Sequence, residues 1–305
     1  MVYAVEQDGE ICAIAPFYRA LTPLGSCLRW MSTGMADRPG WVVHPDTAPE
    51  AAQTLLTLKE HYSLDWHQIL ADSTLAHNAR LQGLLGVDQD ICPYTPLPSD
   101  WPTFTASIGK KLRYNIGYGK RLLERDVGPV RLEVATADEL ETGMDALFHL
   151  HNRRWRQRWM PGGFASPQVR AFHREWAARA LAAGWLRLHV LRVADRITAV
   201  LYVFHTGGDA YYYLSGFDTQ LSRYGLGTVL TGEAIRVAIT EGCTVFDFLR
   251  GAEPYKFRWN ARSRTQVRLV NAHPTWLTPA WRLKVHSECG ISRAFQRIAH
   301  GEGHE

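Results

Sequence analysis

Several side chains suited to acid–base chemistry are crowded into a short stretch near the end of the sequence. Its two carboxylates are Asp247 and Glu253. Asp247 stands between two phenylalanines in an apolar run typical of a strand, so we expect it to point away from them and into a cleft. A partly buried carboxylate there can take the proton that an ammonium group must lose before it attacks a carbonyl carbon. Glu253 lies in an irregular segment, where catalytic residues are common. Together with Arg250, Tyr255 and Lys256, the two carboxylates predict a catalytic site.

A structural interpretation of the same stretch stays open. Asp247 is also compatible with an ion pair to Arg250 or Lys256 that supports the fold. Tyr255 suits core packing, and Lys256 suits a solvated surface. The stretch therefore predicts a site without fixing which carboxylate acts as the base.

A glycine-containing loop at 222–227 precedes a segment with the pattern of a helix. The first amides of a helix have no partner within it, and the helix dipole favours a negative ligand at this end. Glycine lets a phosphate approach such amides closely, and an arginine in the loop adds positive charge. The alternative is a plain connection between strand and helix that binds nothing. The phosphate-binding candidates are Arg223, Gly225, Leu226, Gly227 and Thr228.

A run of cations and aromatics at 152–159 leads into a glycine-containing loop at 160–164. Rings stack on sugars or bases and arginine forks bind phosphate, so we interpret the run as a lid over the acceptor site. A helix with one packed and one solvated face is the other explanation. His149 and His151 are two residues apart on this predicted helix and point to different sides, so no metal site is predicted.

The composition is that of a folded protein with an anionic ligand. The 305 residues are 46% hydrophobic and 21% charged, and the net charge is +4 with a pI near 8.8. This mild excess suits a nucleotide but is too small to predict a nucleic-acid-binding protein. Five scattered cysteines form no C-x-x-C pair, which predicts neither disulfides nor zinc and favours the cytoplasm. The sequence shows no signal peptide or membrane-spanning run, so any membrane association is expected to be peripheral.

The elements that must position these residues alternate between strands and helices. A hairpin over 2–18, a helix over 48–61, a strand over 64–71 and a helix over 73–85 are expected first. The proline-rich stretch 92–98 breaks the pattern and is the predicted domain boundary, and a basic helix over 104–124 follows it. The pattern then predicts a strand over 130–135 and two helices, one opened by a capping box at 136–139 and one that begins after Ser166. A three-stranded meander over 185–216 and a helix over 228–241 are expected next. The last predicted elements are a strand over 244–249, an irregular piece and a strand over 265–272.

This element order resembles the GNAT acyltransferase fold. In that superfamily the loop that holds the pyrophosphate of coenzyme A has the pattern Arg/Gln-x-x-Gly-x-Gly/Ala, and here Ser222 stands at its first position. Three further stretches, 246–259, 111–115 and 211–218, are similar to the CelD-like, BioF2-like acetyltransferases, which resemble FemAB peptidyltransferases in build. The resemblance covers residues 100–272 well and the first hundred residues loosely.

The resemblance implies an α+β fold with a mixed sheet, built as two tandem GNAT-like halves. The first half is expected to be incomplete, because the family has a further strand and helices before the segment that starts here at Met1. The implied domains are a partial one over 1–100, a linking basic helix over 101–127, an acyltransferase domain over 128–275 and a helical tail over 276–305.

The resemblance also implies roles for individual residues. Acetyl-coenzyme A or another acyl-coenzyme A is the expected co-substrate, and Leu214 and Ser215 would pair with its pantetheine arm as an added strand would. A plain sheet interior is the alternative for these two. Tyr255 and Lys256 match an aromatic–lysine pair of FemAB-like proteins. Tyr255 would protonate the departing thiolate, while Lys256 and Arg250 would hold a phosphate or the oxyanion.

The expected reaction is transfer of an acetyl or other acyl group to an amine or hydroxyl of a small-molecule or glycan acceptor related to polysaccharides or the cell envelope. The acceptor would attack the thioester directly in a ternary complex. One alternative is a FemAB-like aminoacyl or peptidyl transferase that contacts tRNA through the basic helix, the one case in which nucleic acid is an expected partner. The other is a non-catalytic GNAT-fold partner of polysaccharide-biosynthesis proteins.

Overall fold

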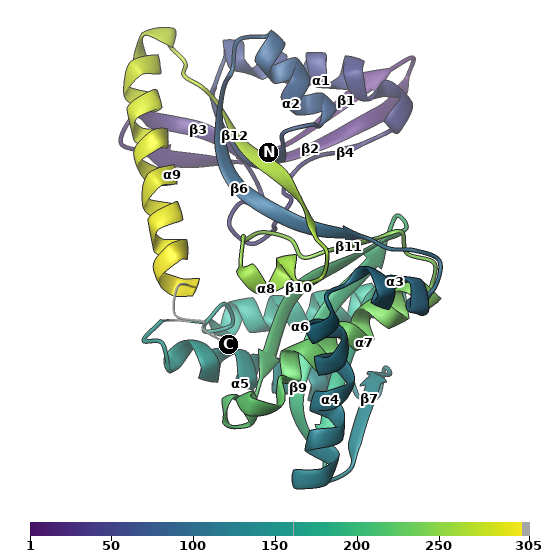
Figure 1. The fold of residues 1–305 in the computed structure, drawn as a ribbon. Coiled ribbons are helices and arrows are strands. Elements are labelled where there is room, and N and C mark those ends of the chain that lie inside the picture. Colours follow the sequence, from purple (N-terminus) through teal and green to yellow (C-terminus); the bar gives the residue numbers. More distant parts are fainter. Residues whose placement is uncertain (161, 301–305) are drawn as a thin grey trace. The chain divides into compact units, whose positions relative to one another are not determined.

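The computed structural model describes residues 1–160 and 162–300, the last ten of them as backbone alone (Figure 1). Contacts divide the chain into two compact units. Unit 1 comprises Met1–Cys92, Arg250–Glu253 and the chain from Ser263 onward, and unit 2 comprises Pro93–Leu249 and Pro254–Arg262. The division between Cys92 and Pro93 falls inside the proline-rich stretch that the sequence marks as a boundary.

Unit 1 is built on a mixed sheet. Its strands, in spatial order, are β1 (Val2–Gln7), β2 (Glu10–Thr22), β3 (Gly25–Trp30), β5 (Ser63–Leu70), β12 (Arg262–Asn271) and β6 (Leu85–Pro96), and β4 (Val42–Val43) pairs with β2. β1 and β2 form the expected hairpin, with Asp8 and Gly9 at positive φ of 54° and 82°, as a tight turn between twisted strands requires. β3 is parallel to β5, and β12 is antiparallel to it.

Helices cover both faces of this sheet. They are η1 (Pro45–Thr47), α1 (Ala48–Leu56), η2 (Thr57–Glu60), α2 (Thr74–Leu81), η4 (Thr275–Leu277) and α9 (Thr278–His300). Leu55 of α1 and Leu75 of α2 pack with Trp66 on one face, while Trp281 of α9 packs with Cys27 and Val270 on the other (Figure 1). The helix expected over 48–61 is α-helical only to Leu56 and ends as a 3₁₀ turn. The expected tail begins its helix at Thr278, and its residues 301–305 lie outside the described part.

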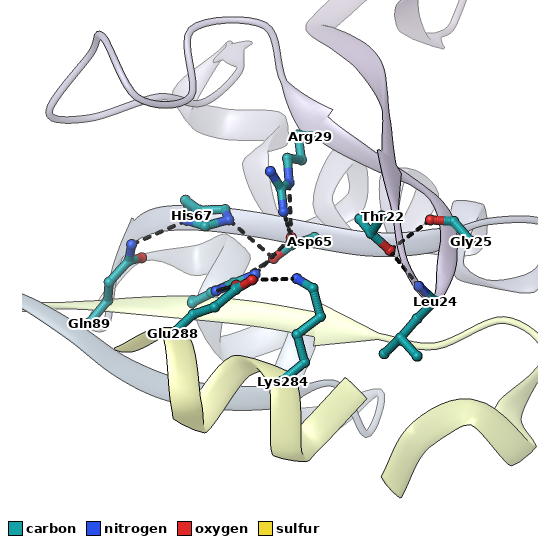
Figure 2. Close-up of polar contacts among 10 residues, drawn as sticks. Thr22, Leu24, Gly25, Arg29, Asp65, His67, Gln89, Lys284 and Glu288 are labelled. Carbon is teal, nitrogen blue, oxygen red and sulfur yellow. Dashed lines mark hydrogen bonds and ion pairs between the residues drawn. The ribbon is translucent and has the colours of Figure 1, made fainter. Parts of the chain in front are cut away.

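A buried charge network joins α9 to the strands of unit 1 (Figure 2). Asp65 on β5 is fully buried and accepts hydrogen bonds from Arg268 Nε at 2.5 Å and Arg29 Nε at 2.9 Å. Arg268 in turn donates to Glu288 of α9 at 2.8 Å. Burial alone would raise the pKa of Asp65, but hydrogen bonds from His67 and Arg268 hold it well below its usual range.

Unit 2 is built on a second stretch of mixed sheet. Its strands, in spatial order, are the end of β6, β11 (Val245–Asp247), β10 (Asp209–Phe217), β9 (Arg196–Thr206), β8 (Leu186–Val193) and β7 (Val130–Val134). The meander is as expected, and β10 is parallel to β11. The proline-rich stretch interrupts the sequence pattern but not the sheet. Tyr94, Thr95 and Pro96 pair with β11, and Pro93 and Pro98 lie outside this paired segment.

Helices also cover both faces of the sheet in unit 2. They are α3 (Trp101–Ser107), α4 (Lys110–Asp126), α5 (Leu140–Arg156), α6 (Pro167–Ala182), η3 (Thr219–Tyr224), α7 (Leu226–Thr240) and α8 (Pro254–Phe257). α3, α4 and α7 share one apolar cluster with the strands, and α5 and α6 share another. The single helix expected over 104–124 is two helices, because Ile108 is extended (ψ 157°) and buries its side chain in the first cluster. Both lie within unit 2.

Candidate functional site

The start of α7 is shaped by the glycine loop that the sequence singled out. Asp218 accepts a hydrogen bond from the amide of Gln220 at 3.0 Å and begins the 3₁₀ turn η3. Gly225 then adopts the left-handed conformation (φ 63°, ψ 42°), which glycine reaches at little cost, and serves as the N-cap of α7. The first amides of α7 therefore point out of the helix end without carbonyl partners in the helix itself.

The approach to these amides is open at Gly227. A Cβ built there would come no closer than 3.9 Å to another side chain, at Cε1 of Phe217. Leu226 is 2% exposed, so it can serve a ligand only through its backbone. The loop and helix start place Gly225, Leu226, Gly227 and Thr228 at the N-terminus of α7, and their role in holding a phosphate stays a prediction.

Arg154 supplies a cation near the end of β10. Its guanidinium lies 4.4 Å from the ring centroid of Phe217, the ring that also borders Gly227. The sequence singled out Arg154 only as part of the run at 152–159. Its position three residues after His151 is the signal that could have predicted that both side chains lie on one face of α5, toward β10. Arg223 behaves differently: its guanidinium lies over the Tyr224 ring at 4.6 Å and 3.8 Å from Asp126, and its side chain is 72% exposed.

The β10 strand has an edge that its parallel neighbour covers only in part. Within the described residues, β11 pairs with β10 from Asp209 to Tyr211 alone. A register shift between Tyr212 and Leu214 follows, and β10 continues to Phe217 against β9 on its other side. Leu214 and Ser215 therefore lie where the two parallel strands have stopped pairing, the position predicted for an added extended chain.

His151 connects α5 to this part of β10. Its Nδ1–H donates to the Ser215 carbonyl at 2.9 Å, and its Nε2 accepts from the Gly163 amide at 3.3 Å. This pattern requires a neutral ring, and burial accordingly lowers the pKa of His151. From the sequence, His151 entered only the argument against a metal site, and its contact with the predicted cofactor strand becomes visible in the structure. One lone pair of the Ser215 carbonyl is thus already engaged.

The five predicted catalytic residues do not all lie in one unit. Asp247 ends β11 in unit 2, is fully buried, and accepts the Leu249 amide proton at 2.7 Å. Tyr255 and the buried Lys256 are on the short helix α8, also in unit 2.

Arg250 and Glu253 belong to unit 1. Arg250 pairs with Asp37; burial tends to lower the pKa of Arg250, but Asp37 outweighs it and raises this pKa. The Glu253 carboxylate is folded back against Gly251, where a Cβ would meet its oxygens at 2.5 and 2.7 Å. Sequence proximity alone therefore does not place these two beside Asp247.

The predicted acceptor lid is anchored at several points. Asn152 donates to the Phe164 carbonyl at 2.9 Å, and Arg153 lies 3.8 Å from Asp218. Trp159 is 97% exposed, and Pro161 lies outside the described residues. The described side chains include no group of three or more histidine, cysteine, aspartate or glutamate residues arranged to hold a metal ion. Of the helices described, none is long and apolar enough to span a membrane.

Comparisons with known proteins bear on the fold. Residues 110–257 match the family model described as an acetyltransferase (GNAT) domain. FemX aligns over 92% of this chain and 90% of its own, with a TM-score of 0.60 and 12% identity. L-PGS from Bacillus licheniformis aligns over 95% and 88%, with a TM-score of 0.59 and 13% identity. A domain assigned to a lysylphosphatidylglycerol synthetase from Agrobacterium fabrum aligns over 89% and 84%, with a TM-score of 0.59 and 12% identity.

No curated protein gives a significant match. At identities this low, the structural likeness establishes the fold alone. The mixed α/β architecture and the GNAT-like fold expected from the sequence are confirmed.

Proposed function

We propose, from the premise that residues 110–257 form a GNAT acetyltransferase domain, that this enzyme moves an acetyl or other acyl group from acyl-coenzyme A to an amine or hydroxyl of a polysaccharide- or envelope-related acceptor. The observation that carries the proposal is the open approach to the α7 amides at Gly227, in the helix that follows β10 after the turn η3; β11 pairs with only the first part of β10. A ligand with a pyrophosphate joined to an extended, amide-bearing arm needs an anion site for the pyrophosphate and, next to it, an unpaired part of a strand edge for the arm.

Three parts of unit 2 are proposed to bind acyl-coenzyme A: the start of α7, Arg154 and the strand β10. The amides of Leu226, Gly227 and Thr228 hold the pyrophosphate, and Arg154 adds positive charge beside Phe217. Leu214 and Ser215 on β10 are proposed to pair with the arm, because the ladder with β11 ends before them. Acyl-coenzyme A supplies the activated thioester, and no covalent bond to the protein is needed.

Asp247 and Tyr255 are the proposed proton-transfer groups. In the reaction the acceptor nitrogen or oxygen bonds to the thioester carbon, the carbon–sulfur bond breaks, and the acceptor loses a proton while the sulfur gains one. Asp247 ends β11 where its pairing with β10 stops, which favours it as the base. Tyr255 on α8 is the proposed acid, and Lys256 the proposed partner of the oxyanion.

An aminoacyl transferase of the FemAB kind is the second candidate. The alignment with FemX covers 92% of this chain and therefore includes both units. On α4, Tyr114 and Tyr118 are exposed and stacked at 5.0 Å, with Lys110, Lys111 and Arg121 exposed on the same helix, a surface suited to RNA. Tight binding of an aminoacyl-tRNA without binding of acetyl-coenzyme A would favour this candidate.

Isothermal titration with acetyl-coenzyme A tests the leading proposal. Gly227→Val should weaken binding about 10-fold or more, because the new side chain would occupy the space that phosphate needs and strand helix amides, at about 1 to 3 kcal/mol. Gly290→Val is the matched control, since Gly290 is an exposed glycine of α9 with no atom within 4 Å of its added Cβ. Unchanged affinity in a folded Gly227→Val protein would rule out the α7 site.

A further inference from the structure

A second concave site lies in unit 2, between α5 and α6. It is a surface pocket of about 550 Å³, a size that suits a small molecule. From α5 it takes a stripe of side chains at helical spacing, and from α6 two arginines one turn apart. Asn152, Arg156 and Gly162 lie in the segments predicted to form the acceptor lid, but none of the lining residues is among those proposed to bind acyl-coenzyme A or to transfer a proton. The lining comprises Asp145, Phe148, His149, Asn152, Arg156, Gly162, Ala165, Arg170 and Arg174.

The charge of the pocket is mainly positive, because three arginines face a single carboxylate. Arg174 pairs with that carboxylate, Asp145, and its guanidinium lies 5.3 Å from the centre of the Phe148 ring. Arg156 is exposed, and its side chain makes no hydrogen bond or ion pair with any residue that the structure describes. One full positive charge at the pocket rim is therefore uncompensated.

The third arginine is held in place by backbone groups. Nη1 of Arg170 donates to the carbonyls of Phe164 at 2.8 Å and Ala165 at 2.7 Å. These bonds fix the guanidinium without neutralising its charge, so little side-chain entropy remains to be lost when it binds a ligand. The same Phe164 carbonyl accepts from Asn152, so the loop that closes the pocket is fastened to both helices.

The loop also leaves the pocket free of bulky side chains. Gly162 lies so close to Asn152 that a Cβ would meet its Oδ1 at 2.3 Å, and Ala165 adds only a methyl group. A larger residue at Gly162 would push the loop away from α5. The small residues therefore leave the recess open, while Arg170 is held by backbone carbonyls and Arg174 by Asp145.

We propose that this pocket binds the phosphate group of a small molecule. A carboxylate presents two oxygens and is satisfied by one arginine fork, whereas a phosphate presents three and can take hydrogen bonds from several guanidinium groups at once. Three arginines from two helices, of which only Arg174 is paired with a carboxylate among the described residues, match the second case. The site is separate from the α7 helix start, and the inference stands whether or not acyl-coenzyme A is the donor.

Phosphate binding to the full chain tests the inference. The exposed ring of His149 lines the pocket, so its proton NMR signals report occupation while inorganic phosphate is added. The Gly227→Val background removes competing anion binding at α7. Arg156→Gln should weaken phosphate binding about 10-fold, the scale of one charge-assisted hydrogen bond. Arg179→Gln is the matched control, because Arg179 is an exposed α6 arginine outside the pocket, paired with Glu175.

The control variants and a second anion decide whether the pocket binds phosphate through Arg156. The proposal predicts intact binding in Arg179→Gln, partial recovery in Arg156→Lys, which restores the charge without the fork, and weaker binding of acetate than of phosphate. Equal phosphate affinity of the parent and Arg156→Gln would overturn it, as would acetate binding as tightly as phosphate. Failure of the protein with Gly227 intact to bind acetyl-coenzyme A, with the His149 response to phosphate retained, would contradict the proposed function and leave this inference standing.

Discussion

Asp247 is the residue on which the proposed chemistry most depends. Its carboxylate is fully buried, and Oδ1 accepts the Leu249 amide proton. Asn can keep that hydrogen bond through its amide oxygen, so Asp247→Asn should preserve the turn after β11. If Asp247 is the base, the variant should lower kcat by about 100- to 10,000-fold and flatten the acidic limb of the pH–rate profile, because no carboxylate remains to be protonated there.

Glu253→Gln is the comparison variant for the same measurement. Glu253 lies in unit 1 with its carboxylate against Gly251, so this variant should change kcat little. A large loss in Glu253→Gln with a mild effect of Asp247→Asn would transfer the role of base to Glu253. Mild effects of both would mean that solvent takes the proton and that positioning supplies the catalysis. Acetyl-coenzyme A affinity, measured in parallel, should stay near the parent value in either variant.

For single residues, the sequence predicts which way a side chain points along its own strand better than it predicts which distant residues the side chain contacts. Alternation along β11 anticipated that Asp247 faces away from Phe246 and Phe248, since that depends on adjacent residues only. The pairing of Arg250 with Asp37 joins residues more than two hundred positions apart and has no local signature. The ring stacking of Arg154 on Phe217 depends in the same way on how α5 packs against β10.

Among the elements of unit 1, α9 depends on the buried charge network for its attachment. Asp65→Asn keeps the side-chain shape but leaves Arg268 and Arg29 without their shared carboxylate (Figure 2). Removing one partner of such a buried pair costs about 3 to 5 kcal/mol. Urea unfolding at pH 7, followed by circular dichroism, should show a loss on this scale. Asp195→Asn is the control, because Asp195 pairs with Arg131 on the surface and should matter little.

The effect of Asp65→Asn should depend on pH in a definite direction. Asp65 has a depressed pKa in the folded protein, so its contribution is complete above the unfolded value of about 3.9 and is lost as pH falls toward the folded value. The stability difference between parent and variant should therefore be constant from pH 7 to about pH 5 and shrink below pH 4. A difference that grows on acidification would contradict the assigned role of Asp65.

Element boundaries were predictable where the signal is local and unpredictable where packing decides. The turn at Asp8 and Gly9 and the glycine before α7 follow from backbone preference. The break between α3 and α4 does not, because Ile108 fits the apolar stripe of one continuous helix and leaves it to fill the core. Close packing of α4 on α7 is likewise set by Gly119, where a Cβ would meet Cγ2 of Val229 on α7 at 2.8 Å and the Tyr224 carbonyl oxygen at the end of η3 at 2.4 Å.

At the scale of the whole molecule, the chain order conceals how the units are composed. The sequence predicted a boundary within the stretch 92–98, a first domain over 1–100 and one continuous domain over 128–275. In the structure, 250–253 and the chain from Ser263 onward belong to unit 1, while 254–262 belong to unit 2. Contact partners far apart in sequence decide this assignment, and no composition change marks it.

The segments that make up unit 2 predict which fragment of the chain can fold alone. Residues 93–262 contain both of its apolar clusters complete, including Trp259, which is 2% exposed and accepts the Thr95 hydroxyl through its carbonyl at 3.1 Å. A fragment that ends at 253 lacks α8 and Trp259. Loss of a buried tryptophan costs about 3 to 5 kcal/mol, a large part of the 5 to 15 kcal/mol that holds a domain folded.

We therefore expect the fragment 93–262 to unfold cooperatively and to bind acetyl-coenzyme A nearly as the full chain does. The fragment 93–253 should melt at a much lower temperature and bind weakly, although it retains α7, the β10 edge and Arg154. Calorimetry of the two fragments, with titration of the ligand into each, separates stability from binding. Failure of 93–262 to fold would show that unit 2 needs residues of unit 1 to complete its core, despite the closure of its two clusters.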